Sequence, residues 1–126
     1  MQVVTIFQNI RETETPFFKD VSYILQRIKE GKNQDLVKKI RQEKNKTKRN
    51  DLKKNLPAIC FSGQFNKRSD SALVEHSGLI CLDFDGYKKK KELLEDKEKF
   101  QKNKFVFSVF VSPSGNGLKV IIKIPA

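Results

Sequence analysis

Leu79-Ile-Cys-Leu-Asp-Phe-Asp-Gly86 is the most informative stretch of the chain, because an apolar run ends there in two carboxylates one residue apart. Strand side chains alternate, so we expect Asp83 and Asp85 on one face, about 6.6–7 Å apart along the backbone. The other face would carry the residues to be buried, Ile80, Leu82 and Phe84. Two acids ending a core strand are costly unless something positive lies between them, and Mg²⁺ is commonly held by one or two carboxylates. Asp-x-Asp also occurs at solvated strand ends, but the apolar run favours the metal site.

Length and composition indicate one soluble, globular domain. The chain has 126 residues, of which 37% are hydrophobic, and ten are Phe. We expect a single domain over 1–126, mostly helical and basic over 1–56, with a sheet and the motifs over 57–126. No apolar run approaches the roughly 18 residues of a membrane span, so we expect no membrane partner and a cytoplasmic location. Cys60 and Cys81 sit in apolar runs and predict two buried, reduced thiols.

The strong positive charge favours a polyanionic partner. The formal net charge is +11 at pH 7, and the basic residues are 21 Lys and 5 Arg. Such a charge attracts DNA, RNA or nucleotides. A lysine excess is also typical of AT-rich genomes, so the charge alone does not establish a nucleic-acid partner.

The order of expected elements predicts an α+β domain with a mixed, largely antiparallel sheet and helices packed mainly on one face. Strands are expected over 3–8, 58–65, 79–85, 104–111 and 118–124. Helices are expected from Thr15-Pro16 to Gly31, in two pieces over 33–56 around the polar break 45–50, and over 88–101, with a short helical turn over 71–76.

The helical region 33–56 is rich in lysine and arginine. A solvated basic helix face is the ordinary interpretation of such a pattern. Contact with a phosphate backbone is the functional alternative. The candidate nucleic-acid-binding residues are Lys38, Lys39, Arg41, Lys48 and Arg49.

A second motif, Ser112-Pro-Ser-Gly-Asn-Gly117, joins the last two expected strands. Asn-Gly is a strong hairpin signal, so a plain turn is one interpretation. The loop is longer than a hairpin needs, and its glycines and amides could form a nest for an anion. Lys119 follows, on the face opposite to Leu118 and Val120. Acids for a metal and a loop for phosphates together are more specific than either motif alone.

These two motifs carry a resemblance to a known family. Residues 77–85 and 112–120 resemble the VirE N-terminal-like domain of bacterial mobile elements and phages, which is related to the archaeo-eukaryotic primase–polymerases. The upstream segment 56–65 and Arg68 also fit, so the resemblance covers about residues 55–124. It implies a primase–polymerase-like fold, complete or partial, and a nucleotidyltransferase role in DNA replication.

The resemblance also implies roles for individual residues. Asp83 and Asp85 would bind the catalytic Mg²⁺ or Mn²⁺ ions, and Lys119 would take the place of a phosphate-contacting histidine. Arg68 would contact the template or the triphosphate, although an ordinary exposed arginine is an equal alternative. The nucleotide-binding residues would be Ser112, Ser114, Gly115, Gly117, Lys119 and Arg68. The implied partners are DNA or RNA, nucleoside triphosphates and a helicase domain or protein.

The resemblance leaves one gap and two alternatives. Primase–polymerases carry a third aspartate on a later strand, but no carboxylate follows Glu98 here. We therefore expect either an N-terminal piece of a longer protein or a catalytically incomplete module that binds nucleotide or nucleic acid. A haloacid-dehalogenase-type phosphatase would use Asp83 as nucleophile and Asp85 as acid. Tyr87 replaces its usual threonine, and too few residues follow for its alternating strands and helices.

Overall fold

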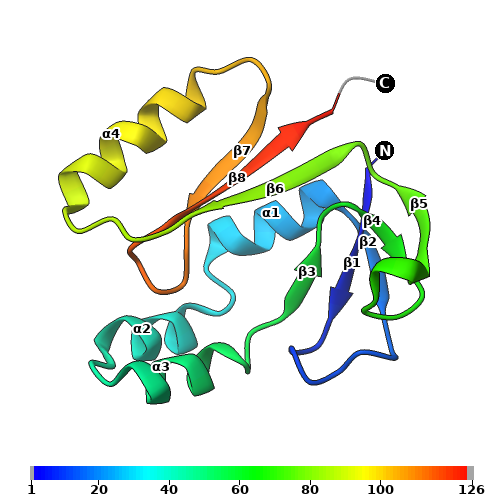
Figure 1. The fold of residues 1–126 in the computed structure, drawn as a ribbon, viewed down its shortest axis with the longest axis horizontal. Helices are drawn as coiled ribbons and strands as arrows, with labels where there is room; N and C mark the ends of the chain where they lie inside the picture. The colour runs from blue at the N-terminus through cyan, green and yellow to red at the C-terminus, as the bar shows by residue number, and fades with distance from the viewer. Residues whose placement is uncertain (1, 125–126) are drawn as a thin grey trace. The chain divides into compact units, whose positions relative to one another are not determined.

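The computed structural model describes residues 2–124. The chain divides into two compact units, Met1–Ser77 and Gly78–Ala126, which we describe separately. Helices and antiparallel strands occur in both units, which confirms the expected α+β class (Figure 1). No helix within residues 2–124 is long and apolar enough to cross a membrane.

The first unit is built on two small antiparallel sheets. Strand β1 (Val3–Phe7) lies between β2 (Phe17–Asp20) and β3 (Ala58–Cys60), and β4 (Gly63–Phe65) pairs with β5 (Leu73–His76). The fully buried Thr5 hydroxyl joins the two sheets. It donates to the Gly63 carbonyl at 2.7 Å and accepts from the Phe65 N–H at 2.9 Å.

Three helices complete the first unit: α1 (Val21–Glu30), α2 (Gln34–Gln42) and α3 (Lys46–Lys53). The expected helix start at Thr15-Pro16 is wrong, because 17–20 form strand β2. Asp20 is extended and its carboxylate accepts from the Ser22 N–H at 2.9 Å, which fixes the helix start after it. The predicted stop at Gly31 is confirmed, since this residue adopts a left-handed φ of 69°.

Two further predictions in the first unit are corrected. The single strand expected over 58–65 is two strands, β3 and β4. At Gly63 a Cβ would lie 2.1 Å from the Glu75 carbonyl oxygen, so only glycine allows this approach of β5. The helical turn expected over 71–76 is limited to Asp70–Ala72, because the following residues extend to pair with β4.

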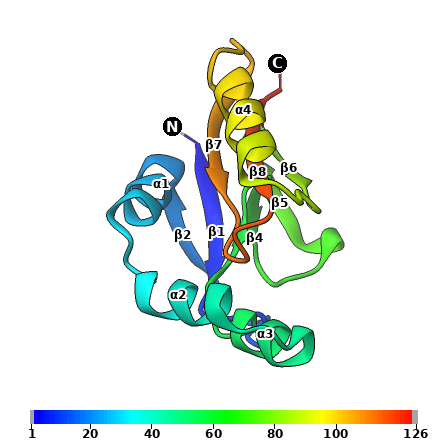
Figure 2. The same cartoon turned by 90° about the vertical axis from the view of Figure 1, so that its left-hand side faces the viewer.

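The second unit is a three-stranded antiparallel sheet with one helix. Strand β8 (Leu118–Lys123) lies between β6 (Leu79–Phe84) and β7 (Val106–Val111). The predicted surface helix is confirmed as α4 (Lys90–Gln101), which packs on β7 and β8 (Figures 1 and 2). Its buried Leu93 meets Leu118 and Val120 of β8. Burying each such side chain stabilises the fold by about 1.5–3 kcal/mol.

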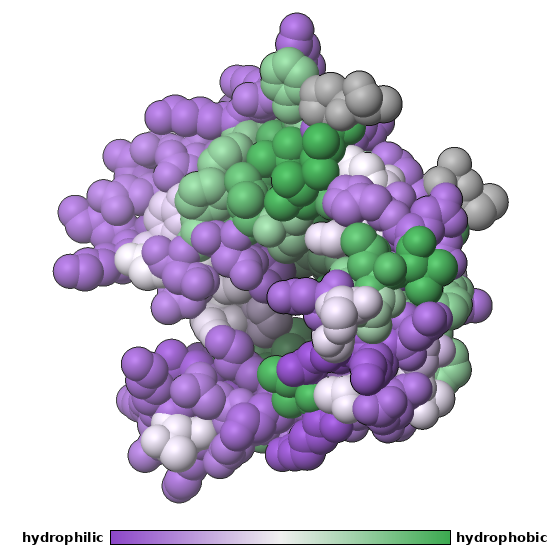
Figure 3. Space-filling view, turned by 45° about the vertical axis from the view of Figure 1, so that its right-hand side comes forward, coloured by the Kyte–Doolittle hydropathy of each residue, from purple (hydrophilic) through white to green (hydrophobic). Residues whose placement is uncertain are grey.

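The expected burial of one β6 face is wrong. Ile80, Leu82 and Phe84 share the α4 face of the sheet but are exposed by 41%, 39% and 37%. The reason is position, because β6 is an edge strand and α4 lies against the other two strands. Phe84 keeps a contact with the Phe100 ring, at 5.2 Å between centroids. Figure 3 shows an apolar area over this part of the sheet.

Candidate acidic site at the end of strand β6

The first carboxylate of the candidate site is paired with the predicted phosphate-binding lysine. Asp83 of β6 and Lys119 of β8 are direct partners in the antiparallel register, so their side chains share a face. The Lys119 Nζ donates to Asp83 Oδ1 at 2.9 Å. The two side chains are exposed by 33% (Lys119) and 54% (Asp83). Sequence reasoning placed both in one site but did not predict that they neutralise each other.

The second carboxylate lies over a glycine at the start of β8. A Cβ on Gly117 would be 2.6 Å from Asp85 Oδ1, 2.9 Å from the Phe84 carbonyl oxygen and 3.1 Å from Ser112 Oγ. Gly117 is two residues before Lys119, so Asp85 continues the register on the same face as Asp83. This agrees with the predicted shared face of the two acids. The site therefore combines two carboxylates, one ammonium group and one hydroxyl.

The loop 112–117 is a hairpin turn whose amides are partly used inside it. The Gly115 N–H donates to the Ser112 carbonyl at 2.9 Å, and the Ser112 N–H donates to the Gly117 carbonyl at 2.9 Å. Gly115 has a left-handed φ of 83°, which favours glycine. Ser112 is buried and Ser114 is half-buried. Two of the amides expected to bind phosphate thus close the turn.

Tyr87 ties this loop to helix α4. Its backbone N–H donates to the Asn116 carbonyl at 3.0 Å, and its hydroxyl donates to Asp96 Oδ2 at 2.7 Å. Desolvation and the Asp96 hydrogen bond raise the pKa of Tyr87 to about 12. Sequence reasoning considered Tyr87 only as a departure from a phosphatase motif and missed this role.

The raised pKa of Tyr87 predicts a loss of stability in strong base. The folded protein keeps the phenol proton above pH 10, where an unfolded tyrosine loses it. The stabilisation is therefore complete below pH 10 and disappears as the pH rises towards about 12. We expect Tyr87→Phe to remove this part of the pH dependence of unfolding, as measured by urea titration at several pH values. An unchanged pH profile in the variant would contradict the contact with Asp96.

Cys81 lies two residues before Asp83 on β6. Burial raises the pKa of its thiol, the Asp83 charge raises it further, and Lys119 lowers it. The thiol is therefore protonated at neutral pH and is a poor metal ligand. Burial also raises the pKa of Cys60. Both cysteines are free, as predicted, but they are half-buried rather than buried.

The remaining predicted residues lie in the first unit. The Arg68 guanidinium donates to the Ile10 carbonyl at 2.6 Å, which gives it a structural contact. The Arg49 guanidinium donates twice to the Glu43 carbonyl, at 3.0 and 2.9 Å, and so binds the end of α2. On α2 and α3, exposed side chains include Lys38, Lys39, Arg41 and Lys48. Arg49 is half-buried, so it contributes least to an open basic face.

Carboxylate oxygens at Asp83 and Asp85 suit Mg²⁺ or Mn²⁺. Within residues 2–124, no three His, Cys, Asp or Glu side chains gather into a metal-binding group. In the second unit, Asp83 and Asp85 are therefore the two residues that would hold a metal ion, with Lys119 beside them.

Comparison with known protein families assigns the chain to a family. Residues 51–126 match the model of the BT4734-like N-terminal domain, which covers more than half of the chain. The chain belongs to the BT4734-like N-terminal domain family. Both carboxylates, Lys119 and the loop 112–117 of this BT4734-like domain lie in the matched range, whereas β1, β2, α1 and α2 lie before it. No curated protein and no solved structure gives a significant match.

The crowding at Gly117 predicts that alanine there disturbs the site. A methyl group would displace Asp85 or Ser112 and press on the Phe84 carbonyl. We expect Gly117→Ala to lower the free energy of unfolding by about 1–3 kcal/mol, as overpacking commonly does. Urea denaturation followed by circular dichroism measures this. Ser114→Ala in the same loop is the control, and equal stability of Gly117→Ala and the native chain would contradict the packing described.

Proposed function

We propose that this BT4734-like domain binds a divalent metal ion and a nucleoside triphosphate through Asp83, Asp85 and Lys119. In this proposal it is the nucleotide-binding part of a primase–polymerase-type nucleotidyltransferase, related to VirE N-terminal-like domains and acting in DNA replication of a phage or mobile element. The observation that carries it is the placement of both carboxylates, the lysine and Ser112 around the junction of β6 and β8.

The two aspartates would hold Mg²⁺ or Mn²⁺. When bound, such an ion would polarise phosphoryl oxygens and stabilise the charge of a leaving pyrophosphate. Asp83 and Asp85 supply the hard, anionic oxygens that these ions prefer. The residues present therefore fit a metal ion held jointly by the protein and substrate phosphates.

Lys119 would move from Asp83 to the triphosphate. An exposed ion pair contributes only about 0–1 kcal/mol, so the exchange costs little. Lysine binds phosphate as a point charge on a flexible stem. In this proposal the metal ion neutralises Asp83 while Lys119 neutralises a phosphate oxygen.

A second candidate is a nucleotide- or nucleic-acid-binding module that does not perform catalysis by itself. The Asp83–Lys119 ion pair favours it, because the lysine already occupies the position where a cation would balance Asp83. The phosphatase alternative is disfavoured, since β6, β7 and β8 are antiparallel and that fold needs alternating parallel strands and helices.

Isothermal titration calorimetry tests the proposal. The protein is titrated with ATP or dATP, first with EDTA and then with Mn²⁺. We expect nucleotide binding that requires the metal ion. Equal binding with EDTA, or none in either condition, would overturn the proposal. Extension of a primed template by the same protein would then favour the transferase over the binding module.

A further inference from the structure

A second surface with functional character lies in the first unit, on strand β2 and helix α1. Phe17 and Tyr23 are exposed by 55% and 44%, which is high for aromatic side chains. Lys19 and Arg27 accompany them, and both are exposed. We call these four residues the aromatic–basic strip.

Strand geometry and one cation–ring contact make the strip continuous. Phe17 and Lys19 are two residues apart on β2 and therefore share a face. The register places them opposite Ile6 and Val4 of β1. The Lys19 Nζ lies 5.1 Å from the centroid of the Tyr23 ring, which joins the strand part of the strip to α1.

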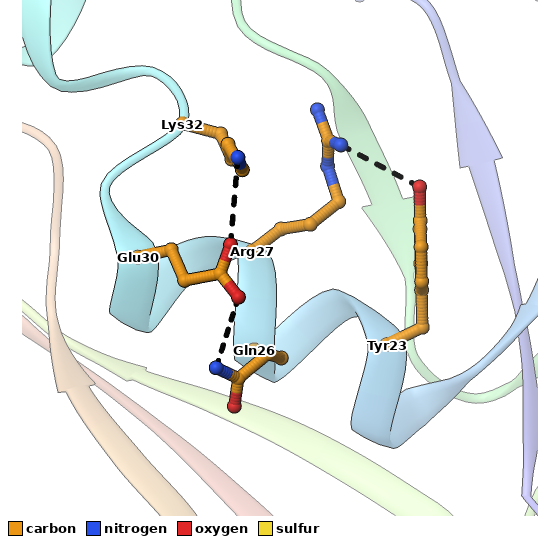
Figure 4. Close-up of polar contacts among 5 residues, drawn as sticks. All are labelled: Tyr23, Gln26, Arg27, Glu30 and Lys32. Carbon is orange, nitrogen blue, oxygen red and sulfur yellow. Dashed lines mark hydrogen bonds and ion pairs between the residues drawn. The ribbon is translucent and has the colours of Figure 1, made fainter.

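Helical spacing continues the strip along α1. Tyr23 and Arg27 are four residues apart and share one helix face. The guanidinium carbon of Arg27 is 5.7 Å from the Tyr23 centroid, and the Arg27 Nη1 donates to the Tyr23 hydroxyl at 3.5 Å. Figure 4 shows the guanidinium beside the hydroxyl end of the ring.

Two acids on or beside α1, Glu30 and Asp20, have their hydrogen bonds with residues outside the strip. Glu30 accepts from Gln26 at 3.0 Å and pairs with Lys32 at 3.5 Å (Figure 4), and its electrostatic interaction with Arg27 is weaker than that with Lys32. Asp20 accepts from Ser22 at the start of α1. The strip therefore keeps a net positive charge next to two accessible rings.

We propose that the aromatic–basic strip binds single-stranded nucleic acid. Unpaired bases stack on exposed aromatic rings, while cations beside them contact phosphates, which is how sequence-tolerant strand binding works. In a duplex the base faces are stacked on one another, so they cannot stack on Phe17 or Tyr23. The net charge of +11 also favours a polyanion over a neutral protein partner. This site requires no metal ion and shares no residue with the acidic site.

Variants that remove a ring but keep an apolar side chain test the stacking. In fluorescence anisotropy with a labelled oligothymidine strand, we expect Phe17→Leu and Tyr23→Leu each to bind about tenfold more weakly. Tyr23→Phe keeps the ring and should bind nearly as the native chain does. Phe105→Leu is the matched control, since Phe105 is 53% exposed and has Lys104 5.1 Å from its ring.

The salt dependence tests the charges. Each phosphate contact in a single strand contributes about 0.7 to the slope of log affinity against log salt. Lys19→Gln combined with Arg27→Gln should therefore reduce the slope by about 1.4. Lys90→Gln combined with Lys91→Gln removes the same charge from α4 and should leave the slope nearly unchanged.

Three results would contradict the proposal that the aromatic–basic strip binds single strands. They are native-like strand binding by both leucine variants, equal weakening by Phe105→Leu, and duplex binding as tight as single-strand binding. Thermal unfolding of each variant separates lost binding from lost fold. Nucleotide titration of the same variants tests the two proposals separately. If strand binding depends on Phe17 but no metal-dependent nucleotide binding is found, the strip proposal is supported and the proposed function is not.

Discussion

Replacing Asp83 and Asp85 together by asparagine is expected to abolish metal-dependent nucleotide binding. Asparagine keeps the size of the side chain but removes both negative charges that hold the cation. Changing only the outer partners of metal ligands commonly costs about 10–100-fold in affinity, so losing both ligands should cost more than about 100-fold. Calorimetric titration with Mn²⁺ and ATP measures the loss.

The matched control for this double variant is Asp51→Asn. Asp51 is also an exposed carboxylate beside a lysine, with Lys54 at 3.5 Å, but it lies on α3. We expect native binding in this control. If the double variant bound Mn²⁺ and ATP with the native affinity, Asp83 and Asp85 would not be metal ligands.

Lys119→Ala is expected to change metal and nucleotide affinity in opposite directions. The ammonium group now competes with a cation for Asp83, at 2.9 Å. Its removal should strengthen Mn²⁺ binding without nucleotide several-fold, because a like charge leaves the site. The same change should weaken triphosphate binding about tenfold, since a charge-assisted contact is lost. Mn²⁺ titration with and without ATP measures both.

Lys54→Ala serves as the control for Lys119→Ala, because it removes a lysine from an exposed pair of the same kind. Neither affinity should change in the control. If Lys119→Ala weakened both affinities equally, the lysine would be a structural support for β6 and β8 instead of a phosphate ligand. The opposite-direction result is specific to the exchange proposed for Lys119.

Local patterns predicted the elements of the second unit well. The apolar run before Asp83, the turn motif at 112–117 and the apolar run after Lys119 each depend on neighbouring residues, and they form β6, a hairpin turn and β8, although burial along β8 does not alternate strictly because Ile121 is buried beside Val120. The strand at 17–20 was mistaken for helix because Phe17 also fits helical spacing. Its pairing with β1 is a non-local contact, and tertiary contacts commonly override such local signals.

The sequence indicated which residues make up the candidate site, but it did not indicate the ion pair between Asp83 and Lys119. Asp83, Asp85 and Lys119 could be grouped by motif, yet their pairing depends on β8 lying beside β6. Sequence order gives only the hairpin of β7 and β8. The exposure of Ile80 and Leu82 also depends on where α4 packs, which the apolar run could not indicate.

The central place of β8 has a consequence for biosynthesis. This strand follows β6 and β7 in the chain, yet both take their hydrogen-bond partners from it. Until residues 118–123 have left the ribosome, these two strands have no sheet to join, and Leu93 has no Leu118 or Val120 to pack against. We therefore expect the pairing of Asp83 with Lys119 to form only after residues 118–123 have emerged.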